Sequence, residues 1–206
     1  LGLNTTYYWR IDTIDGSGNV VTGLIWSFTT IEEGSGVVDD FEDYADSSEL
    51  TGVWTSGGTA SLSLTTDQYE GKWWNHESPQ GKSMQMDFSN SAGESAEAVM
   101  NFSSPQDWTA DYIEALDVYF KGSSGNSSGL EVFVSLDDGV TSHTVYYQDL
   151  DDIDELVIGD WRYQFEWWYA GLQQFADNGV DLTNIEALSL GIAGEGSGTV
   201  YFDSIE

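Results

Sequence analysis

The residues of this sequence best suited to binding chemistry are aromatic side chains on the polar face of expected strands. Residues 115–120, 130–137 and 144–148 alternate along their length, and each carries one aromatic residue out of phase with its apolar face: Tyr119, Phe133 and Tyr146. Side chains two residues apart share one face of a strand, so these rings should point away from the core. Aromatic rings stack on the C–H faces of sugars while polar neighbours bind the hydroxyls. The pattern predicts glycan contacts; the alternative is that the rings fill space under loops.

Three tryptophans join these candidates. The alternation over residues 161–168 places Trp168 on the polar face, opposite Trp161, Tyr163, Phe165 and Trp167. Trp73 and Trp74 are adjacent in "EGKWWNHESPQGKS", a predicted loop. Two neighbours in an extended segment cannot both enter a core, so at least one ring should lie near the surface, where loops often place binding residues. Consecutive strands of a two-layered fold can lie in different sheets, so the candidates need not share one surface.

Catalytic motifs do not stand out in the sequence. His76 and His143 are the only histidines, no nucleophile motif lies near either, and there is no cysteine. The sequence contains no G-x-S-x-G or H-E-x-x-H motif and no phosphate-binding glycine loop. Glycosidases need two carboxylates that face each other, but with 36 acidic residues spacing alone selects no pair. We therefore expect a protein that is not an enzyme.

The charge restricts the partners. Five basic and 36 acidic residues give a formal net charge of −31. Such a surface repels phosphate backbones, which predicts no nucleic-acid partner, and it favours neutral glycans over sulfated or uronic ones unless Ca²⁺ bridges. No apolar run reaches the ~20 residues of a membrane span, so we expect no membrane insertion. The chain has no initiator methionine or signal peptide and begins within a strand pattern, so we expect a piece of a longer polypeptide.

Turn residues divide the chain into three predicted parts. Residues 1–30 contain two alternating segments around a glycine-rich turn, and residues 31–36 ("IEEGSG") are a predicted linker. Residues 37–206 contain about eight or more short alternating segments, separated by loops such as "KGSSGNSSG" and "AGEGSG", with no helical crossovers. This pattern is typical of an antiparallel sandwich or jelly roll.

Two stretches resemble known families. "TTYYWRIDTIDGSGNVVTGLIWSFTT" resembles the closing two strands of a bacterial fibronectin type III-like domain. Residues 37–206 resemble a galactose-binding-like β-sandwich of planctomycete-type surface and secreted proteins, through "VVDDFEDY", "GKSMQMDFSNS", "PQDWTADYIEALDVYFKGSSGN", "GVDLTNIEALSLGIAG" and "GTVYFDSI". The resemblance implies an all-β jelly-roll sandwich preceded by a partial fibronectin type III-like hairpin.

The same resemblance implies a structural Ca²⁺ that ties the first strand of the sandwich to the last. The matching positions are Glu42 and Asp203, with Asp40 as a further candidate and backbone carbonyls completing the shell. "YFDSI" has one aspartate where relatives often have two, so one carboxylate is missing. The alternative is that these acids are simply polar strand ends.

Together these observations predict a non-catalytic module of a larger bacterial protein, extracellular or on the cell surface, that binds carbohydrate. An alternative is a structural subunit of a surface layer, filament or adhesin assembled through β-strand contacts. The first 30 residues suggest it, because a fibronectin-type domain needs seven strands and the hairpin supplies only two. Either the covering strands were upstream and lost, or another surface supplies them. That surface could be the chain's own second domain or a neighbouring molecule, such as another copy of the chain.

Overall fold

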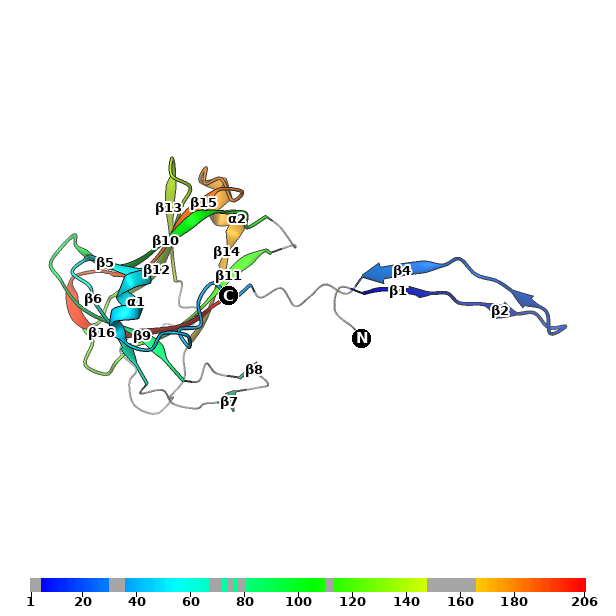
Figure 1. The fold of residues 1–206 in the computed structure, drawn as a ribbon, viewed down its shortest axis with the longest axis horizontal. Helices are drawn as coiled ribbons and strands as arrows, with labels where there is room; N and C mark the ends of the chain where they lie inside the picture. The colour runs from blue at the N-terminus through cyan, green and yellow to red at the C-terminus, as the bar shows by residue number, and fades with distance from the viewer. Residues whose placement is uncertain are drawn as a thin grey trace. The chain divides into compact units, whose positions relative to one another are not determined.

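A computed structural model describes residues 5–29, 36–66, 72–73, 76–77, 81–109, 113–147 and 166–206. The chain divides into two compact units, Leu1–Gly36 and Val37–Glu206. Among the described residues, no helix has both the length and the apolar character needed to cross a membrane. Figure 1 shows the elements of both units.

The first unit consists of antiparallel strand pairs. Strand β1 (Thr6–Trp9) pairs with β4 (Trp26–Thr29), and β2 (Thr13–Ile14) pairs with β3 (Val20–Val21). The turn between β2 and β3 is held by Asp15, whose Oδ1 accepts hydrogen bonds from the backbone N–H groups of Ser17 at 2.8 Å and Asn19 at 2.9 Å. The carboxylate thus supplies hydrogen bonds to backbone N–H groups where the chain reverses.

The second unit contains two five-stranded antiparallel sheets. In spatial order the first sheet consists of β13 (Ser142–Tyr146), β12 (Glu131–Asp137), β15 (Ile185–Ala193), β10 (Ser95–Gln106) and β5 (Trp54–Gly58). The second consists of β14 (Glu166–Gly171), β11 (Ala115–Lys121), β16 (Gly196–Ile205), β9 (Ser83–Asn90) and β6 (Ser61–Thr65). Helices α1 (Ser47–Val53) and α2 (Leu172–Asp177) and the short pair β7 (Lys72–Trp73) and β8 (His76–Glu77) complete the described elements. Neighbouring strands are mostly distant in sequence, as in a sandwich with crossing connections.

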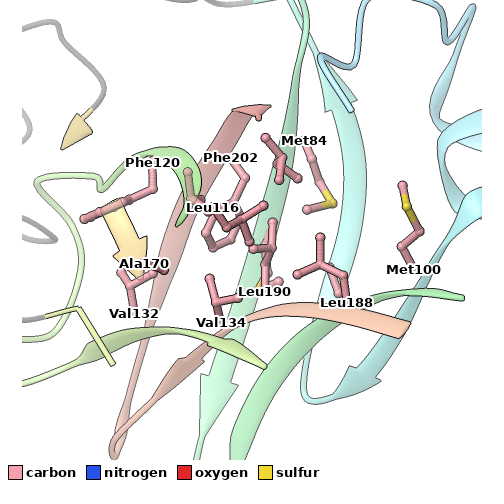
Figure 2. Close-up of a cluster of buried hydrophobic side chains, with 14 of the residues drawn as sticks. Met84, Met100, Leu116, Phe120, Val132, Val134, Ala170, Leu188, Leu190 and Phe202 are labelled. Atoms are coloured by element: carbon pink, nitrogen blue, oxygen red, sulfur yellow. The ribbon is translucent and has the colours of Figure 1, made fainter. Parts of the chain in front are cut away.

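The core lies between the inner faces of the two sheets. Strand β11 alternates buried and partly exposed residues along its length, as the sequence pattern predicts. Figure 2 shows inner-face side chains of both sheets meeting, among them Phe120 and Phe202 from one sheet and Val134 and Leu190 from the other. Burial of this apolar surface is the main force that holds the sheets together.

The side chain of Trp168 points into the core, so the predicted phase of its strand is wrong. Its side chain is only 7% exposed and belongs to the core, whereas Tyr169 is 55% exposed. Trp168 lies opposite Val118 in the β11–β14 ladder, on the inner face of the sheet, and its ring contacts Tyr147 edge-on. The prediction takes its phase from the aromatic residues of 161–167, whereas within β14 the residues of the other phase, Trp168 and Ala170, are buried.

Candidate functional site

An open groove with a volume of about 510 Å³ lies on the outer face of the first sheet. Its lining side chains come from β10, β12, β13 and β15. Because the strands alternate, the residues that do not face the core on these four strands meet on this one surface. The cross-strand register arranges them in rows.

One row contains the aromatic pair. Tyr146 lies opposite Phe133, Phe133 lies opposite Gly191, and Gly191 lies opposite Glu97. The rings of Phe133 and Tyr146 have centroids 5.9 Å apart and are tilted by 60°. Phe133 is 5% exposed, whereas Tyr146 is 43% exposed. Tyr146 is therefore the ring that a ligand in the groove can reach.

Gly191 makes room for Phe133. A Cβ atom at residue 191 would lie 2.2 Å from Cζ of Phe133 and 2.6 Å from the carbonyl oxygen of Ala96. The phenyl ring thus lies across the central strand in the space that a side chain would fill. Although Phe133 is buried, it is outside the core cluster between the sheets, so the predicted direction of its side chain is confirmed. It forms part of the floor of the groove and supports Tyr146.

The adjacent row consists mainly of hydroxyl groups. Thr144 lies opposite Ser135, and Ser135 lies opposite Ser189. The Oγ of Ser135 donates to the carbonyl oxygen of His143 at 3.0 Å, and Thr144 Oγ1 donates to Ser135 Oγ at 3.2 Å. Such hydroxyls both donate and accept, which suits the hydroxyl groups of a sugar.

Three carboxylates complete the lining, and none of the described lining residues is Lys, Arg or His. Glu97 Oε1 accepts a hydrogen bond from Ser95 Oγ at 2.9 Å, and Asp137 Oδ1 accepts one from the backbone N–H of Gly139 at 2.6 Å. The third carboxylate is that of Glu186. Ionised carboxylates only accept hydrogen bonds, so the groove suits a ligand rich in donors and repels anions.

Among the candidates whose side chains the structure describes, two aromatic residues come together. Phe133 and Tyr146 share the groove, whereas Tyr119 lies in the second sheet. Burial raises the pKa of the half-buried Tyr119 hydroxyl, and the carboxylates of Glu206 and Asp117 raise it further. Trp168 is in the core, and the side chains of Trp73 and Trp74 lie outside the described residues.

Sequence reasoning missed Gly191 and the carboxylates of the groove. Gly191 interrupts the apolar alternation of "ALSLGI", and a glycine within a strand is itself a signal of close backbone or side-chain approach. The carboxylates gave no such signal, because 36 acidic residues are spread along the chain.

The predicted metal ligands lie where the start and the end of the second unit meet. The backbone N–H groups of Val38 and Asp39 donate to the carbonyl oxygen of Ile205, and the N–H of Ile205 donates to the carbonyl oxygen of Asp39. Phe41, two residues on, has a φ of 61°, in the left-handed region that non-glycine residues rarely adopt. This turn follows the ladder directly and places Asp40 and Glu42 near the last strand.

Asp203 is the buried carboxylate of this region. It is 1% exposed, its Oδ1 accepts from the backbone N–H of Ser204 at 2.8 Å, and its Oδ2 is buried with no partner among the described residues. Burial raises its pKa to about 8, and the negative charges of Glu42, Asp40 and Asp39 also favour the protonated form. A buried oxygen without a donor is the feature that a cation would satisfy.

The other acids of this region already have hydrogen-bond donors. Glu42 Oε1 accepts from the backbone N–H of Lys82 at 2.6 Å, and Asp40 Oδ1 accepts from that of Glu42 at 3.1 Å. Asp39 accepts from Trp54 Nε1 at 2.7 Å and from the hydroxyl of Tyr44, and so serves the internal structure. Within the described ranges, no three His, Asp or Glu side chains gather as a metal ion would require, so any cation here would depend on carbonyl oxygens as well.

Comparisons with known proteins identify the fold. No family model and no curated protein matches the sequence. The family 30 carbohydrate-binding module of the cellulosomal cellulase Cel9D-Cel44B of Clostridium thermocellum is similar in structure: identity is 14%, the match covers 82% of this chain and 95% of that one, and the TM-score is 0.51. The family 11 carbohydrate-binding module of Lic26A-Cel5E from the same organism matches with 15% identity, 82% and 91% coverage and a TM-score of 0.46.

The chain is therefore an all-β, two-sheet sandwich similar in fold to carbohydrate-binding modules. A family 11 module from Clostridium thermocellum, which matches with 15% identity, 82% and 92% coverage and a TM-score of 0.46, was solved in complex with a β-1,3-1,4-mixed-linked tetrasaccharide. The strand pairs of the first unit are present but are not identified as fibronectin type III.

Proposed function

We propose that residues 37–206 form a non-catalytic carbohydrate-binding module and that a neutral polysaccharide binds in the groove of the first sheet. The observation that carries the proposal is Tyr146, a ring 43% exposed above a floor formed by Phe133. Beside it, hydroxyl and carboxylate groups provide acceptors for sugar hydroxyls. A ring with apolar faces flanked by polar groups is the arrangement that carbohydrate recognition needs.

The charge of the groove supports the choice of a neutral glycan. Its charged lining residues are Glu97, Asp137 and Glu186, and the whole chain has a formal net charge of −31. A sulfated or uronic chain, which is itself negative, would be repelled both by the carboxylates in the groove and by the net negative charge of the whole chain. We further propose that the module belongs to a larger bacterial protein that is extracellular or on the cell surface.

A glycan array followed by affinity gels tests the proposal with a matched pair of variants. Tyr146→Ala should weaken binding about tenfold, the loss of about 1.4 kcal/mol of ring contact, without changing the melting temperature. Tyr169→Ala removes an exposed tyrosine of the second sheet and should leave binding unchanged. Failure of the wild-type protein to bind any glycan, or equal binding by the Tyr146→Ala protein, would contradict the proposal.

We also propose that Ca²⁺ binds between residues 40–42 and the last strand, with Glu42 and Asp203 as ligands and Asp40 as a further candidate. The support is the buried Oδ2 of Asp203, which lacks a donor among the described residues, and the backbone ladder that joins the two segments there. The bound ion would supply positive charge to this group of acids. A ligand that binds only the folded state stabilises it by about 2.7 kcal/mol at 100 times its Kd, so Ca²⁺ should raise the melting temperature above that in chelator.

Asp203→Asn is the control for the calcium proposal. This substitution keeps the size of the side chain and removes the negative charge, so the variant should melt at the same temperature with Ca²⁺ and with chelator. The same temperature for the wild-type protein in both conditions would refute the calcium site.

A second candidate function is supported by the first unit. Trp9 and Trp26 stack with centroids 5.9 Å apart, yet they are 48% and 57% exposed, and the pair formed by Tyr7 and Phe28 continues the same face. Exposed apolar faces are typical of interaction surfaces. The hairpin would then be a fibronectin type III-like element completed by another surface, and the protein a structural subunit of a surface layer, filament or adhesin. Sedimentation and electron microscopy test it: an exclusively monomeric native protein contradicts assembly, and Trp26→Ser should abolish any polymers.

A further inference from the structure

Lys82 holds the segment that contains the proposed calcium ligands. Its Nζ donates to the backbone carbonyl oxygen of Glu42 at 2.8 Å and to that of Tyr44 at 2.9 Å. Its backbone N–H donates to Oε1 of Glu42 at 2.6 Å. One residue thus satisfies a carboxylate oxygen and two carbonyl oxygens of a single short segment.

Gly81, which precedes Lys82, leaves the space that the Glu42 carboxylate occupies. Gly81 has a φ of +105°, and a Cβ atom there would lie 2.2 Å from Oε1 and 2.4 Å from Oε2 of Glu42. Only glycine combines this backbone conformation with the space that the carboxylate occupies. The carboxylate therefore lies directly on the backbone of residues 81 and 82.

The oxygens around Lys82 are of the kinds that bind calcium ions. Carboxylate and backbone carbonyl oxygens at 2.3–2.6 Å are the usual ligands of Ca²⁺, and a lysine ammonium donates to the same kinds of oxygen. The ammonium group contacts the carbonyl oxygens of Glu42 and Tyr44 and not the Glu42 carboxylate, so a divalent ion that takes either carbonyl would have to displace it. Two cations so close together repel each other.

We propose that Lys82 is an internal cation that competes with Ca²⁺ for the oxygens of residues 42–44. Without the ion, the Nζ of Lys82 holds these carbonyls and keeps the segment against the second sheet. With the ion, the ammonium group gives up at least part of these contacts, and this exchange lowers the affinity for Ca²⁺. The inference rests on the proposed calcium site and adds to it a residue that sets the strength of binding.

Calcium titration by calorimetry tests this proposal in the full chain. Lys82→Met removes the charge and the donors but keeps a long side chain, and it should raise the affinity for Ca²⁺ at least threefold while lowering the melting temperature in chelator. Lys121→Met removes the same charge from β11 of the same unit, where the ammonium lies 6.0 Å from the ring centroid of Tyr201, and should leave the affinity within twofold of wild type. The pair separates the loss of specific contacts from the loss of one positive charge.

Each outcome decides the proposal. Tighter binding by the Lys82→Met protein but not by the Lys121→Met protein supports it, as does a Lys82→Met protein that folds only when Ca²⁺ is added. Equal or weaker binding by the Lys82→Met protein overturns the role of Lys82 and leaves the calcium site in place. Absence of calcium binding in both wild type and Lys82→Met overturns both. If the methionine variant does not fold under either condition, Lys82→Gln, which keeps a donor without the charge, is judged by the same threefold criterion.

Discussion

Two residues show how single positions control the candidate sites. Gly191 allows Phe133 to lie across β15 and support Tyr146, and Asp203 places a carboxylate where little solvent reaches it. In both cases the neighbours of the residue, and not its own chemistry, decide what it does. Each leads to a prediction at the level of one substitution.

Gly191→Ala should damage the groove from below. The new methyl group would meet the ring of Phe133 and the carbonyl oxygen of Ala96, and a backbone atom in a central strand cannot move aside easily. We expect the free energy of unfolding to fall by about 1–3 kcal/mol, the usual cost of overpacking, together with loss of glycan binding. Gly125→Ala, where nothing lies within 4 Å of an added Cβ, is the control. Unchanged stability of the Gly191→Ala protein in denaturant titrations would show that Phe133 does not need this space.

Asp203 should make the metal-free protein less stable as the pH rises. Its pKa is raised from 3.8 to about 8 in the folded protein, so between these values the folded state binds more protons than the unfolded chain. Its stabilising contribution is therefore complete below about pH 4 and is lost as the pH rises through about 8. In chelator, the free energy of unfolding of the wild type should fall over this range relative to that of Asp203→Asn. Parallel curves for the two proteins would contradict the raised pKa.

At the level of elements, the turn between β12 and β13 fixes one end of the groove. Asp138 Oδ1 accepts from the backbone N–H groups of Val140 at 2.8 Å and Thr141 at 2.6 Å, and Oδ2 accepts from that of Asp181 at 2.6 Å. The carboxylate thus connects the β12–β13 turn to the loop that leads into β15. Because Asp137 and Ser142 at the base of this turn line the groove, a loose turn would disturb the site.

Asp138→Asn should reveal this connection through pH. The three donors, of which Asp181 contributes most, lower the pKa of Asp138, so its stabilising contribution is present above the ordinary pKa of 3.8 and is lost as the pH falls below it. The variant should melt below wild type at pH 7, and the difference should shrink toward pH 3. Asp107→Asn is a control. The pKa of the Asp107 carboxyl is also lowered, but its hydrogen bonds stay within its own turn. A difference that stays constant with pH would contradict this account.

At the level of the whole molecule, the charge determines the response to salt. A formal net charge of −31 on 206 residues destabilises a compact state through self-repulsion. Raising ionic strength from about 0.01 M to about 1 M shortens the screening length from about 30 Å to about 3 Å, so the melting temperature should rise with NaCl. The affinity for a neutral glycan should hardly change over the same range. A strong salt dependence of glycan affinity would point to a charged ligand instead.

Much of the architecture was predictable because alternation is a local property of each strand. The pattern of "LEVFVSLD" indicates a strand with Phe133 away from the core, and that of "TVYYQ" does the same for Tyr146. The same rule failed at Trp168, because the phase is taken from residues 161–167, whereas within β14 the buried residues are Trp168 and Ala170. Alternation identifies a buried face only when it is followed within the strand that the fold forms.

The sequence by itself determined the all-β class, the alternating faces of most strands, the excess of negative charge and the outward direction of Phe133 and Tyr146. Only the tertiary structure decided that Tyr119 lies in a different sheet, that Gly191 makes room for Phe133, and that Lys82 holds residues 42–44 beside Asp203. The physical reason is the distance along the chain over which each feature is determined. A side chain's direction follows from its own strand, whereas its neighbours depend on pairings between segments that are 40 or more residues apart in the chain, and no local pattern encodes which pairings are made.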